Sequence, residues 1–239
     1  MSSASSSRRP SRASLAACLA LALLSFAGEA RAEAPGVDVP AAGHINWAQV
    51  AVRTEPSRTA PRATVLTQFR PDFRPRVVLA LGVQRDRRGL PAWYRISLPG
   101  RPNGRTGWVP AASVDVKPIR KEIVIDRSER TLELRSAGRV LVRTQVAVGA
   151  YGMETPLGRF YIVAKFRPST PVLGEFAFET SAYSKLSEWP GGGIVGIHGT
   201  NAPSLLGQAV SHGCVRVANE VILRLKELVP VGTPITIRP

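Results

Sequence analysis

The chain of 239 residues carries a formal net charge of +15, from 32 Lys and Arg against 17 Asp and Glu. A protein this basic attracts polyanions at long range. Its basic residues are spread along the chain without a DNA-recognition helix or an RNA-binding signature, so we expect no nucleic-acid partner. Outside the cell membrane the obvious polyanions are anionic cell-wall polymers, and the charge favours attraction to them.

The first 32 residues have the features of an export signal. Three arginines precede a short apolar run over residues 15–27, and Ala30-Arg31-Ala32 matches a small-x-small cleavage site. The apolar run is shorter than the roughly 20 residues of a membrane-spanning helix. We therefore predict a signal peptide over residues 1–32, an exported protein of the cell wall or periplasmic space, and no transmembrane helix after cleavage. An uncleaved amphipathic N-terminus is the alternative.

Removal of the signal would discard Cys18 and leave Cys214 as the only cysteine. One cysteine excludes an intramolecular disulfide in the mature protein. A single thiol retained in an exported protein is a candidate for a reactive group, and this points to Cys214.

Residues 33–43 are rich in Pro, Gly and Ala, and we expect a linker with little order. Residues 44–116 are expected to form a small all-β domain, because short apolar clusters alternate with turns rich in Pro, Gly and Arg. The predicted strands contain Gln49–Val52, Val77–Leu81, Trp93–Ile96 and Trp108–Val109.

The segments 51–56, 93–96 and 107–110 together resemble a bacterial SH3-like β-barrel. The Pro/Arg-rich stretch Phe69–Arg76 departs from that pattern. We expect Trp93 and Trp108 to be core residues; an aromatic face that binds cell-wall peptide or glycan is the alternative. His44 has no partner motif and is expected at the surface.

Lys117-Pro118 marks the predicted boundary of a second domain, over residues 119–239. Alternating patterns predict an antiparallel meander followed by further strands, so the protein is expected to be mainly β. These strands are Glu122–Asp126, Thr131–Leu134, Val140–Val148, Arg159–Phe166, Phe176–Thr180, Ile194–His198 and Thr233–Ile237.

One helix is predicted near the C-terminal side of this domain. Asn219 is an acceptable N-cap, Val221, Leu225 and Leu228 share a face, and Pro230 ends the helix. The glycines before Ile194 lack the Lys-Ser/Thr of a phosphate loop, so we expect no nucleotide and no other cofactor.

The stretch from Ile197 to Val217 contains His198, His212 and Cys214. A thiol is mostly protonated at neutral pH, and a neighbouring imidazole supplies both a base and the charge that stabilises the thiolate. The pattern therefore indicates nucleophilic catalysis by Cys214. A buried structural cysteine is the alternative. The three side chains could also bind zinc, but no Cys-x2-Cys pair or acidic partner accompanies them, so we expect no metal.

Sixteen residues separate His198 from Cys214, and in extended form they would span about 50 Å. The intervening segment must fold back if the two side chains are to meet. Asn201, Pro203 and Gly207 are residues suited to such turns.

The strings His198-Gly-Thr-Asn and Ser211-His-Gly-Cys-Val-Arg216 resemble the signature of the L,D-transpeptidase catalytic domain, the YkuD-type family. The resemblance extends more weakly through residues 148–149 and 155–160 and covers about residues 119–239. Enzymes of that family cut the bond before the terminal D-amino acid of a peptidoglycan tetrapeptide stem. They hold the stem as a thioester and pass it to an amine.

This resemblance implies roles for the motif residues. Cys214 is the expected nucleophile and His198 the expected base, oriented by the backbone carbonyl of Gly199. His212 either shapes the pocket or is a second candidate base. The backbone N–H groups of Gly213 and Cys214 are expected to hold the developing oxyanion.

Four further residues are candidates for substrate binding. Arg216 could bind a stem-peptide carboxylate, with a structural ion pair as the alternative. Ser211 is expected to support the loop. Tyr183 and Trp189 are candidates to line the groove, and simple packing is their alternative role.

The predicted function is thus an exported peptidoglycan L,D-transpeptidase that forms 3-3 cross-links or related products from stem peptides. Two alternatives remain open. Water could intercept the same thioester, as in an L,D-carboxypeptidase-type thiol hydrolase. The chain could also be a non-catalytic cell-wall-binding protein.

Overall fold

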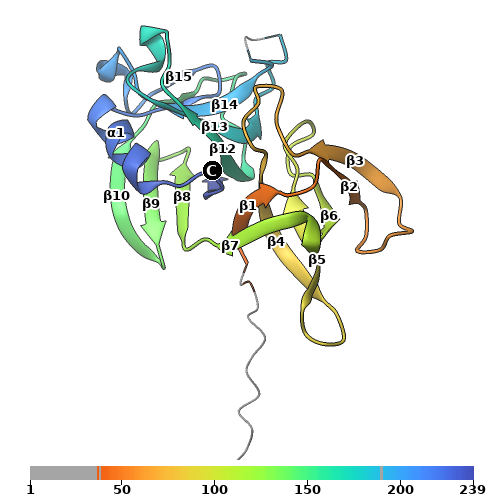
Figure 1. Ribbon diagram of the computed structural model, residues 1–239. Helices are drawn as coiled ribbons and strands as arrows, with labels where there is room; N and C mark the ends of the chain where they lie inside the picture. The colour runs from red at the N-terminus through yellow and green to blue at the C-terminus, as the bar shows by residue number, and fades with distance from the viewer. Residues whose placement is uncertain (1–36, 38, 189–190) are drawn as a thin grey trace, which may run out of the picture. The chain divides into compact units, whose positions relative to one another are not determined.

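The computed structural model describes residue 37 and residues 39–188 and 191–239. The predicted signal peptide and Trp189 lie outside the described residues. The described chain is mainly β, as predicted, and forms a seven-stranded and an eight-stranded sheet (Figure 1). Among the described residues, no helix is both long enough and apolar enough to cross a membrane.

The N-terminal sheet is antiparallel throughout, with the strand order β3-β2-β6-β5-β4-β1-β7. Alternate residues such as Val52, Ile96 and Val109 form its core. Its strands are β1 (Ala41–Ile45), β2 (Gln49–Arg53), β3 (Arg62–Thr67), β4 (Val77–Arg85), β5 (Pro91–Ser97), β6 (Thr106–Pro110) and β7 (Val114–Pro118).

Two expectations for this sheet are wrong. Residues 41–43, assigned to the linker, belong to β1, because Ala41 and Ala42 are buried where β1 pairs with both β4 and β7. Trp93 and Trp108 are half-buried and are not part of the core, because the neighbours Tyr94 and Val109 occupy the inner face. In a strand, successive side chains point to opposite faces.

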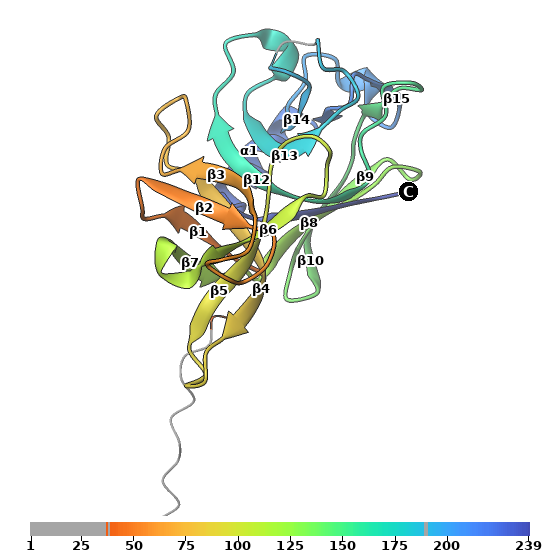
Figure 2. The same cartoon turned by 90° about the vertical axis from the view of Figure 1, so that its right-hand side faces the viewer.

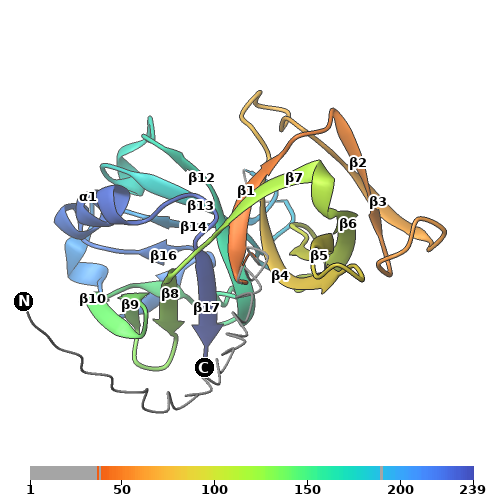
Figure 3. The same cartoon turned by 60° about the horizontal axis from the view of Figure 1, so that its bottom comes forward.

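The C-terminal sheet has the order β10-β9-β8-β17-β12-β13-β14-β16 (Figures 2 and 3). Two residue pairs of β11 (Val148–Gly149) and β15 (Ala209–Ser211) form a separate parallel ladder. The strands of the large sheet are β8 (Lys121–Asp126), β9 (Thr131–Ser136), β10 (Arg139–Gln145), β12 (Gly158–Phe166), β13 (Ala177–Tyr183), β14 (Ile194–His198), β16 (Val215–Arg216) and β17 (Pro234–Arg238).

The predicted antiparallel meander is confirmed for β8, β9 and β10, and the pairing of the later strands was not predicted. β17 lies between β8 and β12 and runs parallel to β8, and β16 runs parallel to β14. Alternation of apolar residues reports burial, and it does not report which strand becomes the neighbour.

Helix α1 (Asn219–Leu228) packs on the C-terminal sheet through Ile222 and Leu225, which are fully buried. Val221 and Leu228 pack against the same core. The predicted cap is wrong by one residue. Ala218 occupies the N-cap position, and the side chain of Asn219 instead bonds loops beside the helix.

The two sheets meet along β1, β4 and β12 (Figure 3). Tyr161 is fully buried there, and its hydroxyl donates a hydrogen bond of 3.2 Å to the carbonyl of Val77. Ala42, Leu79 and Val163 complete an apolar cluster around its ring. Buried residues from both sheets therefore pack against one another.

Candidate active site

Cys214 lies in a tight loop between β15 and β16. The Ser211 hydroxyl braces this loop, since it donates to the Cys214 carbonyl at 2.5 Å and accepts the Gly213 N–H at 3.1 Å. Gly213 has a φ of 115°, and a Cβ at this position would lie 2.9 Å from the Cβ of Ser184. A side chain at position 213 would be both strained and obstructed.

The Gly213 bond corrects one expectation. Its N–H is already bonded to Ser211, so it is not free to hold an oxyanion. The backbone N–H of Cys214 remains the candidate donor from this loop. The Gly213 N–H is not available because the Ser211 hydroxyl that fixes the loop accepts its hydrogen bond.

His198 is the last residue of β14 and reaches the cysteine through strand pairing. β14 and β16 pair with Ile197 opposite Val215 and His198 opposite Arg216. This parallel pairing closes the segment that the sequence required to fold back. An ideal Cβ on Gly196 would lie 3.7 Å from His198 Cδ2 and 3.9 Å from Cys214 Sγ, so both side chains meet over Gly196.

The imidazole of His198 is buried and oriented by Gly199. Its Nδ1 is 2.6 Å from the Gly199 carbonyl, which can only accept, so Nδ1 carries the proton and Nε2 is free. Burial lowers the pKa of His198 to about 4; the bond to Gly199 opposes this shift and the nearby Arg216 adds to it. At neutral pH the ring is an uncharged base.

The thiol of Cys214 is also in its neutral form at rest. Burial raises the pKa of Cys214, while the Gly196 N–H, which donates to Sγ at 3.3 Å, and the charge of Arg216 act in the opposite direction. The expected imidazolium charge that stabilises a thiolate is therefore not present before the reaction. Proton transfer to His198 has to accompany the attack of the sulfur.

A pocket of about 510 Å³ contains these groups. Its volume is in the range of small-molecule sites in proteins. Apolar side chains of Phe166, Val172 and Leu173 form part of its wall. The polar and charged side chains that line it belong to Thr170, Glu179, His198, Ser211, His212, Cys214 and Arg216.

Arg216 enters this pocket without a protein counter-ion. Among the described residues no carboxylate lies within ion-pair distance of it, and its Nε is buried without a hydrogen-bond partner. The structural ion pair considered as the alternative is therefore not formed by that part of the chain. A guanidinium of this kind is available to a ligand carboxylate.

Comparison with known proteins now identifies the fold family. A model of the L,D-transpeptidase catalytic domain (YkuD) matches residues 120–237. The homologue YkuD of Bacillus subtilis is 33% identical over 149 residues, which cover 62% of this chain and 77% of that protein. Its counterpart in Bacillus licheniformis is 38% identical over 125 residues, covering 52% and 68%.

The chain belongs to the L,D-transpeptidase family. The family resemblance of the His198 and Cys214 motifs is thereby confirmed. L,D-Transpeptidases act on peptidoglycan stem peptides. The SH3-like assignment of the N-terminal sheet stays a prediction.

Solved structures of L,D-transpeptidases are similar at lower identity. An enzyme from Mycobacterium smegmatis is 17% identical with a TM-score of 0.45, over 69% of this chain and 91% of that one. An enzyme from Enterococcus faecium is 21% identical with a TM-score of 0.41, over 52% of this chain. The match spans 56% of the length of the Enterococcus chain.

One candidate groove residue of this L,D-transpeptidase, Tyr183, is not among the described residues that line the pocket holding Cys214. Tyr183 ends β13, and its ring lies under the guanidinium of Arg101 at 4.9 Å, beside a second pocket of about 720 Å³. Trp189 lies outside the described residues. His44 is exposed on β1, as expected for a surface residue.

Two residues of the site were missed by sequence reasoning. The Oδ1 of Asn219 accepts the N–H groups of Thr200 and Glu175, and its Nδ2 donates to the Thr200 carbonyl, which fixes the turn after His198. Glu179 lines the pocket from β13, directly opposite Gly196. Neither residue belongs to a motif, and a glutamate in an alternating strand resembles any solvent-facing residue.

Within the described ranges, no group of three or more His, Cys, Asp or Glu side chains is arranged to hold a metal ion. His212 and Cys214 both line the pocket. Among the described residues, the pocket instead brings together the thiol of Cys214, the imidazole of His198 and the guanidinium of Arg216.

Proposed function

We propose that this chain is an exported peptidoglycan L,D-transpeptidase that works through a thioester on Cys214. The observation that carries the proposal is the convergence of Cys214 Sγ and His198 over Gly196, in a pocket that also holds the unpaired Arg216. Export rests on the predicted signal over residues 1–32.

The first half-reaction forms the thioester. Sγ attacks the carbonyl carbon before the terminal D-residue as Nε2 of His198 takes the thiol proton. The Cys214 N–H is the proposed donor to the oxyanion. The C–N bond then breaks, and His198 returns the proton to the departing amine.

The second half-reaction transfers the stem. An acceptor amine attacks the thioester carbon and gives a proton to His198. The C–S bond then breaks, and His198 passes that proton to the sulfur to restore the thiol. Arg216 binds a carboxylate of the stem in both halves, and His212 shapes the pocket beside Sγ. If water replaces the amine, the same steps give hydrolysis.

The test is incubation of the purified protein with a disaccharide-tetrapeptide, analysed by mass spectrometry. Loss of the terminal D-residue with formation of a dimer supports transfer. Formation of monomeric tripeptide alone would show that the protein is a hydrolase. Binding of the substrate without turnover would indicate a cell-wall-binding protein.

Replacement variants locate the thioester in the same assay. We expect Cys214→Ala to abolish dimer formation, while His44→Ala, a change at an exposed residue of β1, retains it. The intact mass of the wild-type protein should show an acyl adduct that the Cys214→Ala protein lacks. Dimers from the Cys214→Ala protein would show that the nucleophile is misassigned.

A further inference from the structure

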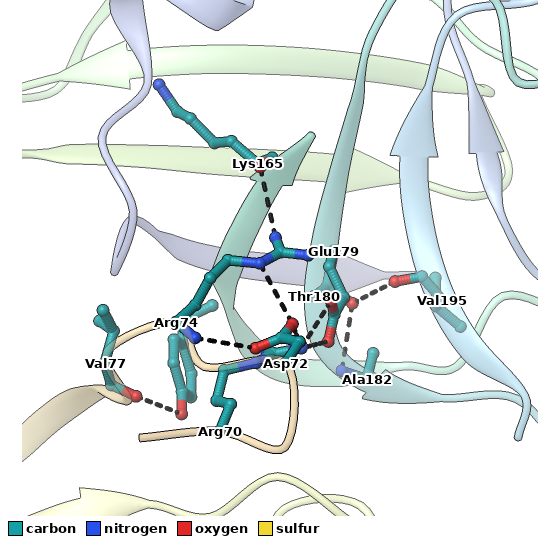
Figure 4. A network of polar contacts seen from close by, with 10 residues as sticks. Arg70, Asp72, Arg74, Val77, Lys165, Glu179, Thr180, Ala182 and Val195 are labelled. Atoms are coloured by element: carbon teal, nitrogen blue, oxygen red, sulfur yellow. Dashed lines mark hydrogen bonds and ion pairs between the residues drawn. The ribbon is translucent and has the colours of Figure 1, made fainter. Parts of the chain in front are cut away.

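The loop between β3 and β4 connects the N-terminal sheet to the catalytic pocket. This loop contains the Pro/Arg-rich residues that depart from the SH3-like pattern. Its Arg70 donates from Nη2 to both carboxylate oxygens of Glu179, at 2.7 and 2.8 Å, across 109 positions of sequence (Figure 4). The loop therefore has a specific contact in the other sheet.

Glu179 stands beside the nucleophile. It pairs with Gly196 across β13 and β14, and directly opposite residues of antiparallel strands project to the same face. Because an ideal Cβ on Gly196 would be 3.9 Å from Cys214 Sγ, the Glu179 side chain leaves its strand within about 10 Å of the sulfur. Glu179 and Arg216 are the two Asp, Glu, Lys or Arg side chains that line the pocket among the described residues.

The pair is largely shielded from water. The side chains of Arg70 and Glu179 are each 17% exposed, and Arg70 Nε is buried without a partner. Asp72 also lies 3.3 Å from Arg70 and 3.1 Å from Arg74. Removal of one partner from such a pair leaves the other charge uncompensated.

We propose that Arg70 is a positioning residue which neutralises Glu179, so that Arg216 is left as the uncompensated charge of the pocket and selects an anionic stem peptide. The inference rests on the proposed function for the identity of the peptide. Without Arg70, the Glu179 carboxylate would oppose the field of Arg216 on a bound carboxylate. Two unit charges about 10 Å apart near a protein surface change a binding constant by about tenfold.

The test compares Arg70→Met, Glu179→Gln and the double variant. The matched control is Arg74→Met, which removes the same charge from the same loop but whose partners are Asp72 and the Lys165 carbonyl. For each protein, KM and kcat are measured with the disaccharide-tetrapeptide. The Kd of that peptide is measured by calorimetry in the unreactive Cys214→Ser background.

We expect Arg70→Met to raise KM and Kd about tenfold with kcat changed less than threefold. Glu179→Gln should lower Kd by a few fold, because loss of the carboxylate makes the charge beside the pocket more positive, although Asp72 remains 3.3 Å from Arg70. The double variant should return to within threefold of the wild-type Kd, because neither charge remains. Arg74→Met should stay within twofold.

Three results would overturn the inference: an unchanged Kd in Arg70→Met, a tenfold weaker Kd in Glu179→Gln, or no recovery in the double variant. If Arg70→Met does not fold, the double variant decides, since normal affinity supports charge compensation and tenfold weaker affinity contradicts it. If the wild type gives no turnover while the Kd pattern holds, the proposed function fails and the inference stands.

Discussion

The two sheets differ in how their strands find their neighbours. The N-terminal sheet uses antiparallel pairs alone, whereas the C-terminal sheet also contains the parallel pairs β8–β17 and β14–β16. The chemistry lies at the second of these parallel pairs, where His198 is opposite Arg216. The proposed nucleophile and base, which are 16 residues apart, are thus brought together by a parallel strand pair, a kind of pairing that the N-terminal sheet lacks.

The N-terminal sheet supplies contacts to the strand that borders this chemistry. Arg70 holds Glu179, and Asn103 bonds both the N–H and the carbonyl of Tyr183 near the other end of β13. Arg101 donates to the carbonyls of Ser184 and Gly192. The C-terminal sheet contains the proposed reacting groups, and loops of the N-terminal sheet bond to the strand beside them.

The largest expected effect comes from breaking the catalytic pairing itself. His198→Ala removes the base and should lower kcat/KM for tetrapeptide turnover by about a thousandfold, since general-base catalysis contributes 10² to 10⁴. The fold should be kept, as judged by circular dichroism. A loss of less than tenfold would show that His212 or water acts as the base.

The next largest effect is the pH dependence of acylation, which also depends on the C-terminal sheet. Because the pKa of His198 is lowered to about 4, its ring stays neutral down to that pH. Below that pH the ring is protonated and can no longer accept the thiol proton. The rate of acylation should therefore fall about tenfold per pH unit below about pH 4. A profile of acylation against pH, with His44→Ala as the control, checks this. An inflection near pH 6.5 would contradict a buried base.

A smaller effect is expected from the contact of Asn103 with β13. Asn103→Ala leaves a donor and an acceptor of Tyr183 without their partner, which should cost about 1–3 kcal/mol in the free energy of unfolding. Urea unfolding measures this change. Asn103→Asp retains the acceptor alone and should fall between Ala and wild type. Equal stability of all three proteins would mean that water replaces these bonds.

The smallest effect concerns the buried contact between the sheets. Tyr161→Phe removes the hydroxyl that donates to Val77 and keeps the ring in its apolar cluster. We expect a loss of about 1 kcal/mol in unfolding free energy with unchanged turnover. A change in KM larger than threefold would show that this contact also shapes the pocket.

Strand positions and the family motifs could be predicted from the sequence, and the neighbours of each strand could not. The alternation over Glu122–Asp126 predicted β8 within one residue, and the motifs identified Cys214 and His198. The insertion of β17 beside β8 depends on contacts between residues more than 100 positions apart, which no local pattern reports.

The misassigned residues have the same cause. Trp93 is apolar enough for a core, but the register of β5 gives the inner face to Tyr94. Glu179 becomes part of the pocket because β14 places Gly196 opposite it. The Gly213 N–H is not the oxyanion donor that the sequence predicted, because it donates to the Ser211 hydroxyl.

β17 lies in the middle of its sheet, although its residues are the last of that sheet to be synthesised. Residues 234–238 follow every other strand of their sheet in synthesis, yet they separate β8 from β12 within it. A chain emerging from a ribosome or an export channel would hold the cysteine loop on an unfinished scaffold until those residues arrive. Acylation competence should accordingly appear late and in one step, which limits premature modification of the thiol during transit.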